Sequence, residues 1–256
     1  MNILLLDYDG FIAKAFYAGY DKEKPGDFEE CIKCLRNLEE YATENAEMFF
    51  TDEDFIVKKI VSGHTLKKDI YPSYKCSRKQ DDNLGLFREF IKKNEDVIIA
   101  EHEEADDLII RLNEANRNNS LVISDDKDLH KYCKWTCKLN QEFVPNKEHF
   151  SIEEQLIQLI AGDSTDGIKG VPNIGEYKAK KYLKNVGYSF ENVIKLYKES
   201  NISIDECAKN IILVHPIARG VLNPDIEINS VYDIIKEIST RIKEVYYNEE
   251  KTDNKE

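Results

Sequence analysis

The chain has 256 residues, of which 36 are Lys or Arg and 49 are Asp or Glu, so its formal net charge is −13. A chain of this length can bury a substantial core, which predicts one large domain or a domain with a smaller appended unit. The net charge argues against a nucleic-acid partner. Two basic stretches oppose that conclusion: residues 58–93 hold ten Lys/Arg against four Asp/Glu, and residues 167–184 hold five lysines against one glutamate. Without a basic leader or an apolar run of membrane-spanning length, we expect a cytoplasmic protein with no membrane partner.

Short apolar runs that lead to acidic residues recur through the first half of the chain. Such runs are typical of strands buried on both faces of a parallel sheet. They are Ile3–Leu6 before Asp7, Met48–Phe50 before Asp52, Val97–Ala100 before the acids of 101–107, and Leu121–Ile123 before Asp126 and Asp128. Helical patterns lie between them at 28–42, 84–93 and 104–116. This alternation predicts a doubly wound α/β fold with a mostly parallel sheet, whose strands bring the acids to one edge.

From residue 151 onward the pattern is helical. It predicts helices at 151–160, 177–184 and 190–198, and a last amphipathic helix with apolar residues at 231, 234, 235, 238, 242 and 245. We therefore expect an α/β core over 1–160 and a helical subdomain over 161–256 packed on it. Cys31 and Cys34 have a spacing that zinc sites use, but they fall inside a helical pattern, which favours reduced structural thiols.

Acidic residues cluster at the start of the helical pattern 104–116. Glu104 and Asp107 are neighbours one turn apart, and Asp106 lies to the side. Alone, these acids need no further function, because acids in the first turn of a helix complement its dipole. Asp163 and Asp166 have a similar structural interpretation as an N-cap and its partner.

Taken together, the acids favour a metal site. Carboxylates crowded at one rim repel each other and raise one another's pKa, so a cation must compensate them. Oxygen ligands with no histidine at ligand spacing favour Mg²⁺, with Mn²⁺ as a substitute, over zinc. The number of acids favours two ions about 4 Å apart. The predicted metal ligands are Asp7, Asp52, Glu104, Asp106, Asp107, Asp126, Asp128, Asp163 and Asp166.

The segment from Gly162 to Lys184, GDSTDGIKGVPNIGEYKAKKYLK, places acids directly before a glycine-rich loop and a lysine-rich helix. Gly170 and Gly175 allow backbone N–H groups to approach a phosphate closely. The lysines can neutralise phosphates, and Lys178 is the preferred contact, whereas others are expected to be only solvated. The lysines of this helix are Lys178, Lys180, Lys181 and Lys184.

Five segments, in this order, resemble the successive motifs of the 5′ nuclease superfamily, which comprises flap endonucleases, phage 5′→3′ exonucleases and the 5′-nuclease domain of bacterial DNA polymerase I. They are Leu6–Gly10, Tyr74–Lys75, Glu104–Asp107, Ser124–Leu129 and Gly162–Leu183. The resemblance implies a PIN-like α/β fold and a helix–three-turn–helix motif over about 161–184. It also implies structure-specific cleavage of DNA or RNA/DNA by two metal ions, leaving a 5′-phosphate and a 3′-hydroxyl.

The resemblance further assigns roles to individual acids. Those around the more tightly held ion would be Asp7, Asp52, Glu104, Asp106 and Asp126. Those that serve the second ion would be Asp128, Asp163 and Asp166.

Roles toward the substrate follow from the same resemblance. An arch or gateway is expected near 64–95, where Tyr74 would stack on the terminal base and Lys75 and Arg78 would hold the scissile phosphate. The hairpin 170–175, with Lys178 and Lys181, would grip the backbone of duplex DNA, and K⁺ at its carbonyls is compatible with the family. Only 30 positions separate Tyr74 from Glu104, which predicts a truncated or partly open arch.

The expected partners are DNA with a 5′ flap or 5′ end, an RNA/DNA hybrid, and a single-strand binding protein or polymerase, with the protein itself a monomer. The expected role is primer removal, replication or repair. The main alternative is a catalytically weak, structure-specific DNA-binding accessory protein. A PIN-type ribonuclease would lack the hairpin 170–175, and an EF-hand calcium protein would need ligand spacings that DSTDG does not provide.

Overall fold

The computed structural model describes residues 1–51, 53–70, 72, 74–76, 81–139, 152–164, 166–214, 236, 238–240 and 242–244. The chain divides into two compact units. The first comprises Met1–Thr65 and Lys79–Phe150, and the second comprises Leu66–Arg78 and Ser151–Glu256. The sequence predicts a boundary between residues 160 and 161, whereas the contacts divide the chain after residue 150 and place 66–78 in the second unit.

The first unit is built on a five-stranded sheet with the order β3-β2-β1-β4-β5. All neighbouring strands run parallel. The strands are β1 (Asn2–Asp7), β2 (Phe55–Thr65), β3 (Ile98–His102), β4 (Ser120–Ile123) and β5 (Thr136–Cys137). Because the chain extends the sheet first on one side of β1 and then on the other, the winding reverses between β1 and β4. Ligands bind outside the carboxyl ends of the strands at such a switch point.

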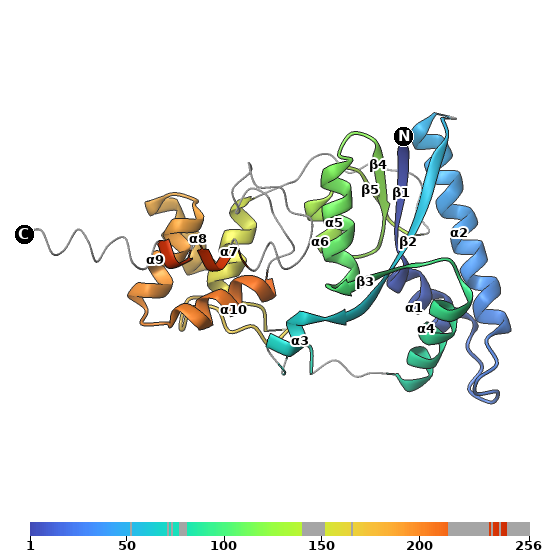
Figure 1. The fold of residues 1–256 in the computed structure, drawn as a ribbon, viewed down its shortest axis with the longest axis horizontal. Helices are drawn as coiled ribbons and strands as arrows, with labels where there is room; N and C mark the ends of the chain where they lie inside the picture. The colour runs from blue at the N-terminus through green and yellow to red at the C-terminus, as the bar shows by residue number, and fades with distance from the viewer. Residues whose placement is uncertain are drawn as a thin grey trace, which may run out of the picture. The chain divides into compact units, whose positions relative to one another are not determined.

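Helices cover both faces of this sheet (Figure 1). The apolar run of β1 explains the two layers, since successive side chains of a strand point to opposite faces. Leu4 and Leu6 belong to one core with residues of α1 (Tyr8–Gly19), α2 (Glu29–Phe50) and α4 (Asp82–Asn94). Ile3 and Leu5 belong to the other, with residues of α5 (Ala105–Ala115) and α6 (Lys127–Tyr132). The predicted fold class, a parallel sheet flanked by helices, is confirmed.

One predicted strand is wrong. Met48–Phe50, expected to be a strand that delivers Asp52 to the sheet edge, forms the end of α2. The residues lie in helix because Ala42, Ala46 and Phe50 recur every four positions and are all buried, whereas Met48 is 60% exposed. The sequence did not predict β2, in which polar residues interrupt the apolar ones. Asp52 itself lies outside the described residues.

The second unit is helical in its described part, with α3 (Leu66–Ile70), α7 (Ile152–Ala161), α8 (Glu176–Val186), α9 (Phe190–Glu199) and α10 (Ile204–Val214). Three of these confirm the helices predicted at 151–160, 177–184 and 190–198. The hydroxyl of buried Tyr197 donates to the Leu159 carbonyl over 2.6 Å, which joins α9 to α7. Of the predicted last helix, residues 231, 234, 235 and 245 lie outside the described residues, while Ile238 and Ile242 are buried. Among the described residues, no helix is long and apolar enough to cross a bilayer.

Two glycines of the first unit provide a test of the packing. A Cβ at Gly63 in β2 would lie 2.6 Å from the Ala100 carbonyl oxygen of β3, whereas a Cβ at Gly85 in α4 would meet nothing within 4 Å. We expect Gly63→Ala to lower the free energy of unfolding by about 1–3 kcal/mol, because the strands must separate. Gly85→Ala, the matched control, should raise it by about 0.5–1 kcal/mol through helix propensity. Urea unfolding followed by circular dichroism measures both, and equal effects of the two changes would contradict the β2–β3 contact.

Candidate functional site

The central acid of the site is Asp7, the last residue of β1 and the residue before α1. Its side chain is 7% exposed. Its carboxylate accepts a hydrogen bond from the Ser124 hydroxyl over 2.6 Å. A Cβ at Gly10 would lie 3.2 Å from Asp7 Oδ2, so the glycine leaves room for this carboxylate in the first turn of α1. The end of the central strand thus holds a buried acid at the switch point.

The loop after β4 carries a second set of acids. The backbone N–H of Asp126 donates to the Ser124 hydroxyl oxygen over 2.9 Å, and the Asp126 carboxylate accepts from the Asp128 N–H over 2.7 Å. Ser124 therefore joins Asp7 to Asp126, residues that are 119 positions apart in sequence (126 − 7). Asp126 is also the N-cap of α6, so its position is set by the helix that follows.

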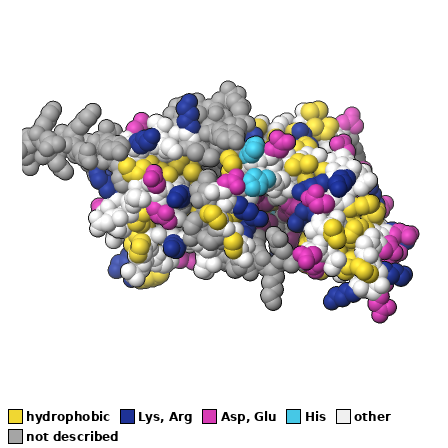
Figure 2. Space-filling view, turned by 60° about the horizontal axis from the view of Figure 1, so that its bottom comes forward, with side chains coloured by type: hydrophobic (Ala, Val, Ile, Leu, Met, Phe, Trp, Pro, Cys, Tyr) yellow, Lys and Arg dark blue, Asp and Glu magenta, His cyan; other side chains and the backbone are white. Residues whose placement is uncertain are grey.

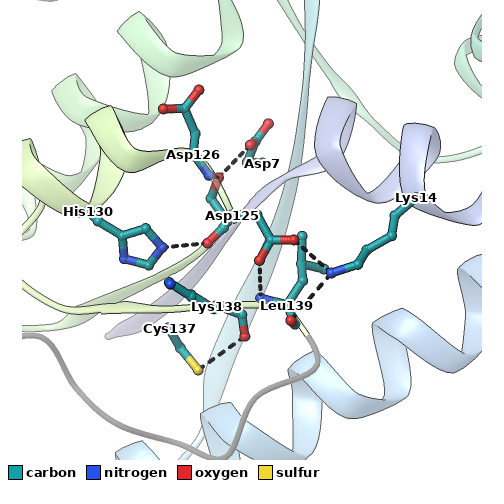
Figure 3. A network of polar contacts seen from close by, with 9 residues as sticks. Asp7, Lys14, Asp125, Asp126, His130, Cys137, Lys138 and Leu139 are labelled. Carbon is teal, nitrogen blue, oxygen red and sulfur yellow. Dashed lines mark hydrogen bonds and ion pairs between the residues drawn. The ribbon is translucent and has the colours of Figure 1, made fainter.

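Two side chains, those of His130 and Asp125, hold this loop in place (Figure 3). His130 contacts the Ser124 carbonyl oxygen through Nε2 and the Thr136 hydroxyl through Nδ1, each at 2.7 Å. Because a carbonyl can only accept, Nε2 carries the proton. Asp125 faces the other way and pairs with Lys14 over 2.7 Å. His130 was not predicted as a site residue, and its only sequence signal is its place one turn after Asp126.

The third set of acids lies at the start of α5. Glu104 and Asp107 form a capping box, with the Asp107 carboxylate accepting from the Glu104 N–H over 3.3 Å. The Ala105 N–H donates to the Ser62 hydroxyl of β2 over 3.0 Å, which anchors the helix start to the sheet. The structural interpretation of Glu104 and Asp107 as helix-end acids is therefore confirmed. Their role as metal ligands stays a prediction.

The carboxylates at these three places interact electrostatically. Burial raises the pKa of Asp7 from 3.8 to about 6, the Ser124 hydrogen bond opposes that rise, and Asp9 and Asp126 add to it. The pKa of Asp106 is raised well above its ordinary value by burial and then by Asp7, Glu104, Asp107 and Asp126. In the described part of the chain, no group of three or more His, Cys, Asp or Glu side chains is arranged to hold a metal ion by itself. The electrostatics nevertheless fit a cation, because crowded, buried carboxylates are stabilised by positive charge.

Tyr8 and Asp9, which follow Asp7 in the predicted motif, serve the framework. The Tyr8 hydroxyl donates to Glu39 of α2, and the Lys59 ammonium lies 5.3 Å from the centre of the Tyr8 ring. Asp9 accepts from the Ser62 N–H over 2.8 Å and pairs with Arg88 of α4 over 2.9 Å. These contacts fix the start of α1, and with it the residue before it, Asp7.

The second unit contains the loop of Asp163 and Asp166. Asp163 and Ile168 form an antiparallel bridge across this loop. Their backbone groups exchange hydrogen bonds of 2.9 and 2.7 Å. Gly162 and Gly170 have positive φ, and a Cβ on either would lie 2.4 Å from backbone of this loop. Gly170 is therefore required by packing within the chain. The Asp166 N–H donates to the Asp163 carboxylate over 3.3 Å.

The predicted hairpin lies between this loop and α8. Asn173 has φ +61, so it adopts the left-handed conformation, which asparagine tolerates. The Lys178 ammonium donates to the Asn173 carbonyl over 2.9 Å, so the preferred phosphate contact closes the hairpin in this structure. Gly175 is the N-cap of α8, and a Cβ there would meet nothing within 4 Å. The other lysines of α8, Lys180, Lys181 and Lys184, are exposed.

The predicted gateway residues are described only in part. Tyr74 is 3% exposed, so the stacking of its ring on a base would require the ring to leave its present burial. The Lys75 N–H donates to the Asp166 carbonyl over 3.3 Å, within the second unit. Arg78 lies outside the described residues. On the face drawn in Figure 2, basic and acidic side chains of the described residues lie interspersed.

The fold and its switch-point acids define an α/β protein with an acidic site at the carboxyl edge of a parallel sheet. No protein-family model matches the chain. The DNA polymerase I of Rhizobium leguminosarum is 30% identical over 217 residues, which cover 73% of this chain and 21% of that protein. A 5′-3′ exonuclease of Mycoplasmopsis pulmonis is 25% identical over 226 residues, covering 78% of this chain and 72% of that protein. The chain thus spans about a fifth of the polymerase but most of the exonuclease.

Solved structures share the fold. A T5 5′-exonuclease with bound zinc has a TM-score of 0.56 at 15% identity, covering 96% of this chain and 99% of that chain. A bacteriophage T5 flap endonuclease in complex with DNA and metal ions has the same TM-score and coverage at 14% identity. At these sequence identities, the solved structures support only the assignment of the fold. The sequence relatives, a polymerase I and a 5′-3′ exonuclease, support the assignment of the chain to the 5′ nuclease superfamily.

The burial of Asp7 generates a pH prediction. Since its pKa is raised to about 6, the folded protein binds this proton more tightly than the unfolded chain does. The ionised Asp7 carboxylate therefore lowers the free energy of unfolding, and the full effect is present above pH about 6. The effect disappears as the pH falls to about 4. In EDTA we expect Asp7→Asn to raise the free energy of unfolding by about 3 kcal/mol at pH 8 and by little at pH 4. Asp96→Asn, at an exposed position, is the control, and a gain that does not change with pH would contradict the assignment.

Proposed function

We propose that the protein is a divalent-metal-dependent, structure-specific 5′ nuclease. It would cut DNA or RNA/DNA at a 5′ flap or 5′ end and leave a 5′-phosphate and a 3′-hydroxyl, in primer removal, replication or repair in the cytoplasm. The observation that carries the proposal is the buried Asp7, crowded by Asp106 and Asp126 at the switch point of the sheet. The names of the relatives, a polymerase I and a 5′-3′ exonuclease, supply the reaction class.

The metal ligands are proposed in two groups. Asp7, Glu104, Asp106 and Asp126, with Asp52, would hold the first ion. Asp128, Asp163 and Asp166 would hold the second. Asp107, whose carboxylate accepts from the Glu104 N–H in the capping box, is proposed as a further metal ligand. Two Mg²⁺ ions, or Mn²⁺ in their place, supply Lewis-acid activation of the attacking water and of the leaving oxygen when bound.

The other residues of the site would orient the acids and the substrate. Ser124 holds Asp7 and Asp126 in one network, and Ser62 anchors the start of α5, so the carboxylates need little rearrangement during the reaction. Lys75, with Arg78, would hold the scissile phosphate through its positive charge.

The hairpin and α8 would bind duplex backbone. Gly175 at the N-cap leaves the first N–H groups of α8 open to a phosphate, and the exposed Lys181 can neutralise another. Lys178 is proposed to support the hairpin at Asn173 and to reach a phosphate from there. K⁺ at the hairpin carbonyls, a polymerase or single-strand binding protein as partner, and a monomeric state remain part of the proposal.

Cleavage of a 5′-flap duplex, labelled at either end in separate reactions, tests the proposal directly. With Mg²⁺ we expect cuts near the junction and products that carry a 3′-hydroxyl, and with EDTA no cleavage. Asp126→Ala and Asp163→Ala should each slow cleavage by at least about 100-fold, because each removes an acid that holds an ion. Asp96→Ala and Asp205→Ala, exposed acids in the first and second units, are the matched controls.

Two results would contradict the nuclease. Tight binding of the flap duplex without cleavage, equal in wild type and both acid variants, would identify the alternative, a structure-specific DNA-binding accessory protein. Products with a 3′-phosphate would exclude in-line attack by water as proposed.

The basic stretch of α8 gives a second prediction. The affinity for a flap duplex, measured in Ca²⁺ or EDTA, should fall steeply between about 50 and 200 mM salt, because phosphate contacts release counterions. Each of Lys180→Ala, Lys181→Ala and Lys184→Ala that removes a phosphate contact should lower the salt slope by about 0.9. Lys33→Ala, on an exposed face of α2 where the lysine pairs with Glu29 and Glu30, is the control. A DNA affinity that does not change with salt concentration would contradict the proposal that α8 binds the phosphates of DNA.

A further inference from the structure

Ser62, near the end of β2, has a contact on each side. Its backbone N–H donates to the Asp9 carboxylate over 2.8 Å, and its hydroxyl accepts from the Ala105 N–H over 3.0 Å. Asp9 lies two positions after Asp7. Ala105 is the first residue of α5 and follows Glu104 directly. The serine therefore connects the segment of Asp7 to the helix that carries the third set of acids.

The pairing of β2 with β3 becomes irregular at this serine. The register shifts between Ser62 and Thr65. Irregularities of this kind in a strand re-aim side chains, and they are frequent next to active sites. Ser62 also lies two positions beyond Ile60, the β2 residue that pairs with Asp7. The strand thus places Ser62 at the carboxyl edge of the sheet, on the side of Asp7 that faces β3.

The Asp9 carboxylate lies close to other acids but is itself paired. Burial is the main cause of the raised pKa of Asp7, and the charge of Asp9 adds more to it than the charge of Asp126 does. A further carboxylate near Asp7 is unfavourable unless a cation compensates it. Arg88 of α4 supplies that cation, since its Nε lies 2.9 Å from Asp9 Oδ1. One oxygen of Asp9 therefore faces the guanidinium, and the other accepts from the Ser62 N–H.

We propose that Asp9 and Arg88 are positioning residues of the metal site. Acting through Ser62, they set the spacing between Asp7 and the acids at the start of α5. Arg88 holds the Asp9 carboxylate and compensates its charge, the carboxylate holds the Ser62 backbone, and the Ser62 hydroxyl holds the first N–H of α5. In this role neither side chain of the ion pair is a metal ligand. The proposal rests on the proposed nuclease function, because the spacing matters where the acids share an ion.

Binding of Mn²⁺ to the protein without DNA, followed by electron paramagnetic resonance of the free ion, tests the proposal. Two double variants remove the same two charges and differ in one acceptor. Asp9→Asn with Arg88→Gln keeps an oxygen for the Ser62 N–H, and its Mn²⁺ affinity should stay within about threefold of the wild type. Asp9→Ala with Arg88→Ala removes that oxygen, and its affinity should fall by about tenfold or more.

Two results of this comparison would overturn the proposal. Equal losses of affinity in both double variants would identify Asp9 as a metal ligand. Wild-type affinity in both would mean that the ion pair serves only the fold. Glu30→Ala with Lys33→Ala is the matched control, since it removes an exposed ion pair of α2 and should leave Mn²⁺ binding unchanged.

A double-mutant cycle tests whether the path runs through Ser62. Ser62→Ala removes the acceptor for the Ala105 N–H and should weaken Mn²⁺ binding by about tenfold. Added to Asp9→Ala with Arg88→Ala, it should cause little further loss, because both changes release the same helix start. Additive losses would contradict the path. Ser62→Ala keeps the ion pair, so it replaces the double alanine variant if urea unfolding shows that the latter does not fold.

Hydrogen–deuterium exchange gives a measurement that needs no metal ion. In EDTA the Ala105 amide should be protected in the wild type and in Asp9→Asn with Arg88→Gln. It should exchange about tenfold faster or more in Ser62→Ala and in Asp9→Ala with Arg88→Ala. If the wild type binds no Mn²⁺, the proposed function is wrong, but the exchange still decides whether the ion pair holds the start of α5. Equal exchange in all four proteins would overturn the positioning role.

Discussion

The burial of the Asp7 carboxylate at the end of the central strand is the constraint on which the site depends. A carboxylate that loses water must be compensated by hydrogen bonds or by positive charge, or its pKa rises. In this protein the Ser124 hydroxyl compensates only in part, and the pKa of Asp7 rises to about 6. The arrangement is unfavourable for a bare protein and favourable for one that binds a cation, and this difference links the fold to the proposed chemistry.

Two serines connect the acids to the sheet. Ser62 on β2 receives the first N–H of α5, and Ser124 after β4 joins Asp7 to Asp126. Ser124 is buried and Ser62 is partly buried. The Ser124 hydroxyl fixes the Asp7 carboxylate directly, and the Ser62 hydroxyl fixes the backbone of Ala105, the residue after Glu104. Several acids serve at the same time as helix caps, as Asp126 does for α6 and Asp107 does in the capping box of α5. The local helix signals and the predicted metal ligands are therefore the same residues, which is why neither interpretation excludes the other.

The second unit holds a tight loop through contacts between backbone groups. Gly162 and Gly170 pack backbone against backbone, and the bridge between Asp163 and Ile168 closes the loop. The Lys75 N–H, from a distant part of the chain, donates a further hydrogen bond to the Asp166 carbonyl. A loop with this many backbone contacts can present Asp163 and Asp166 in a fixed geometry, as a site that is organised before its ligand arrives requires.

The sequence by itself determined the α/β class, the order of the acids along the chain and the family, because buried parallel strands leave continuous apolar runs and the acids follow those runs at recognisable spacings. It misplaced Met48–Phe50, since a short apolar run does not distinguish the end of a buried helix from a strand when tertiary contacts choose between them. Only the tertiary structure showed that Ser124 joins Asp7 to Asp126 and that His130 supports Ser124. These relations depend on side chains that meet across the sheet or across a loop, and no spacing along one chain records such a meeting.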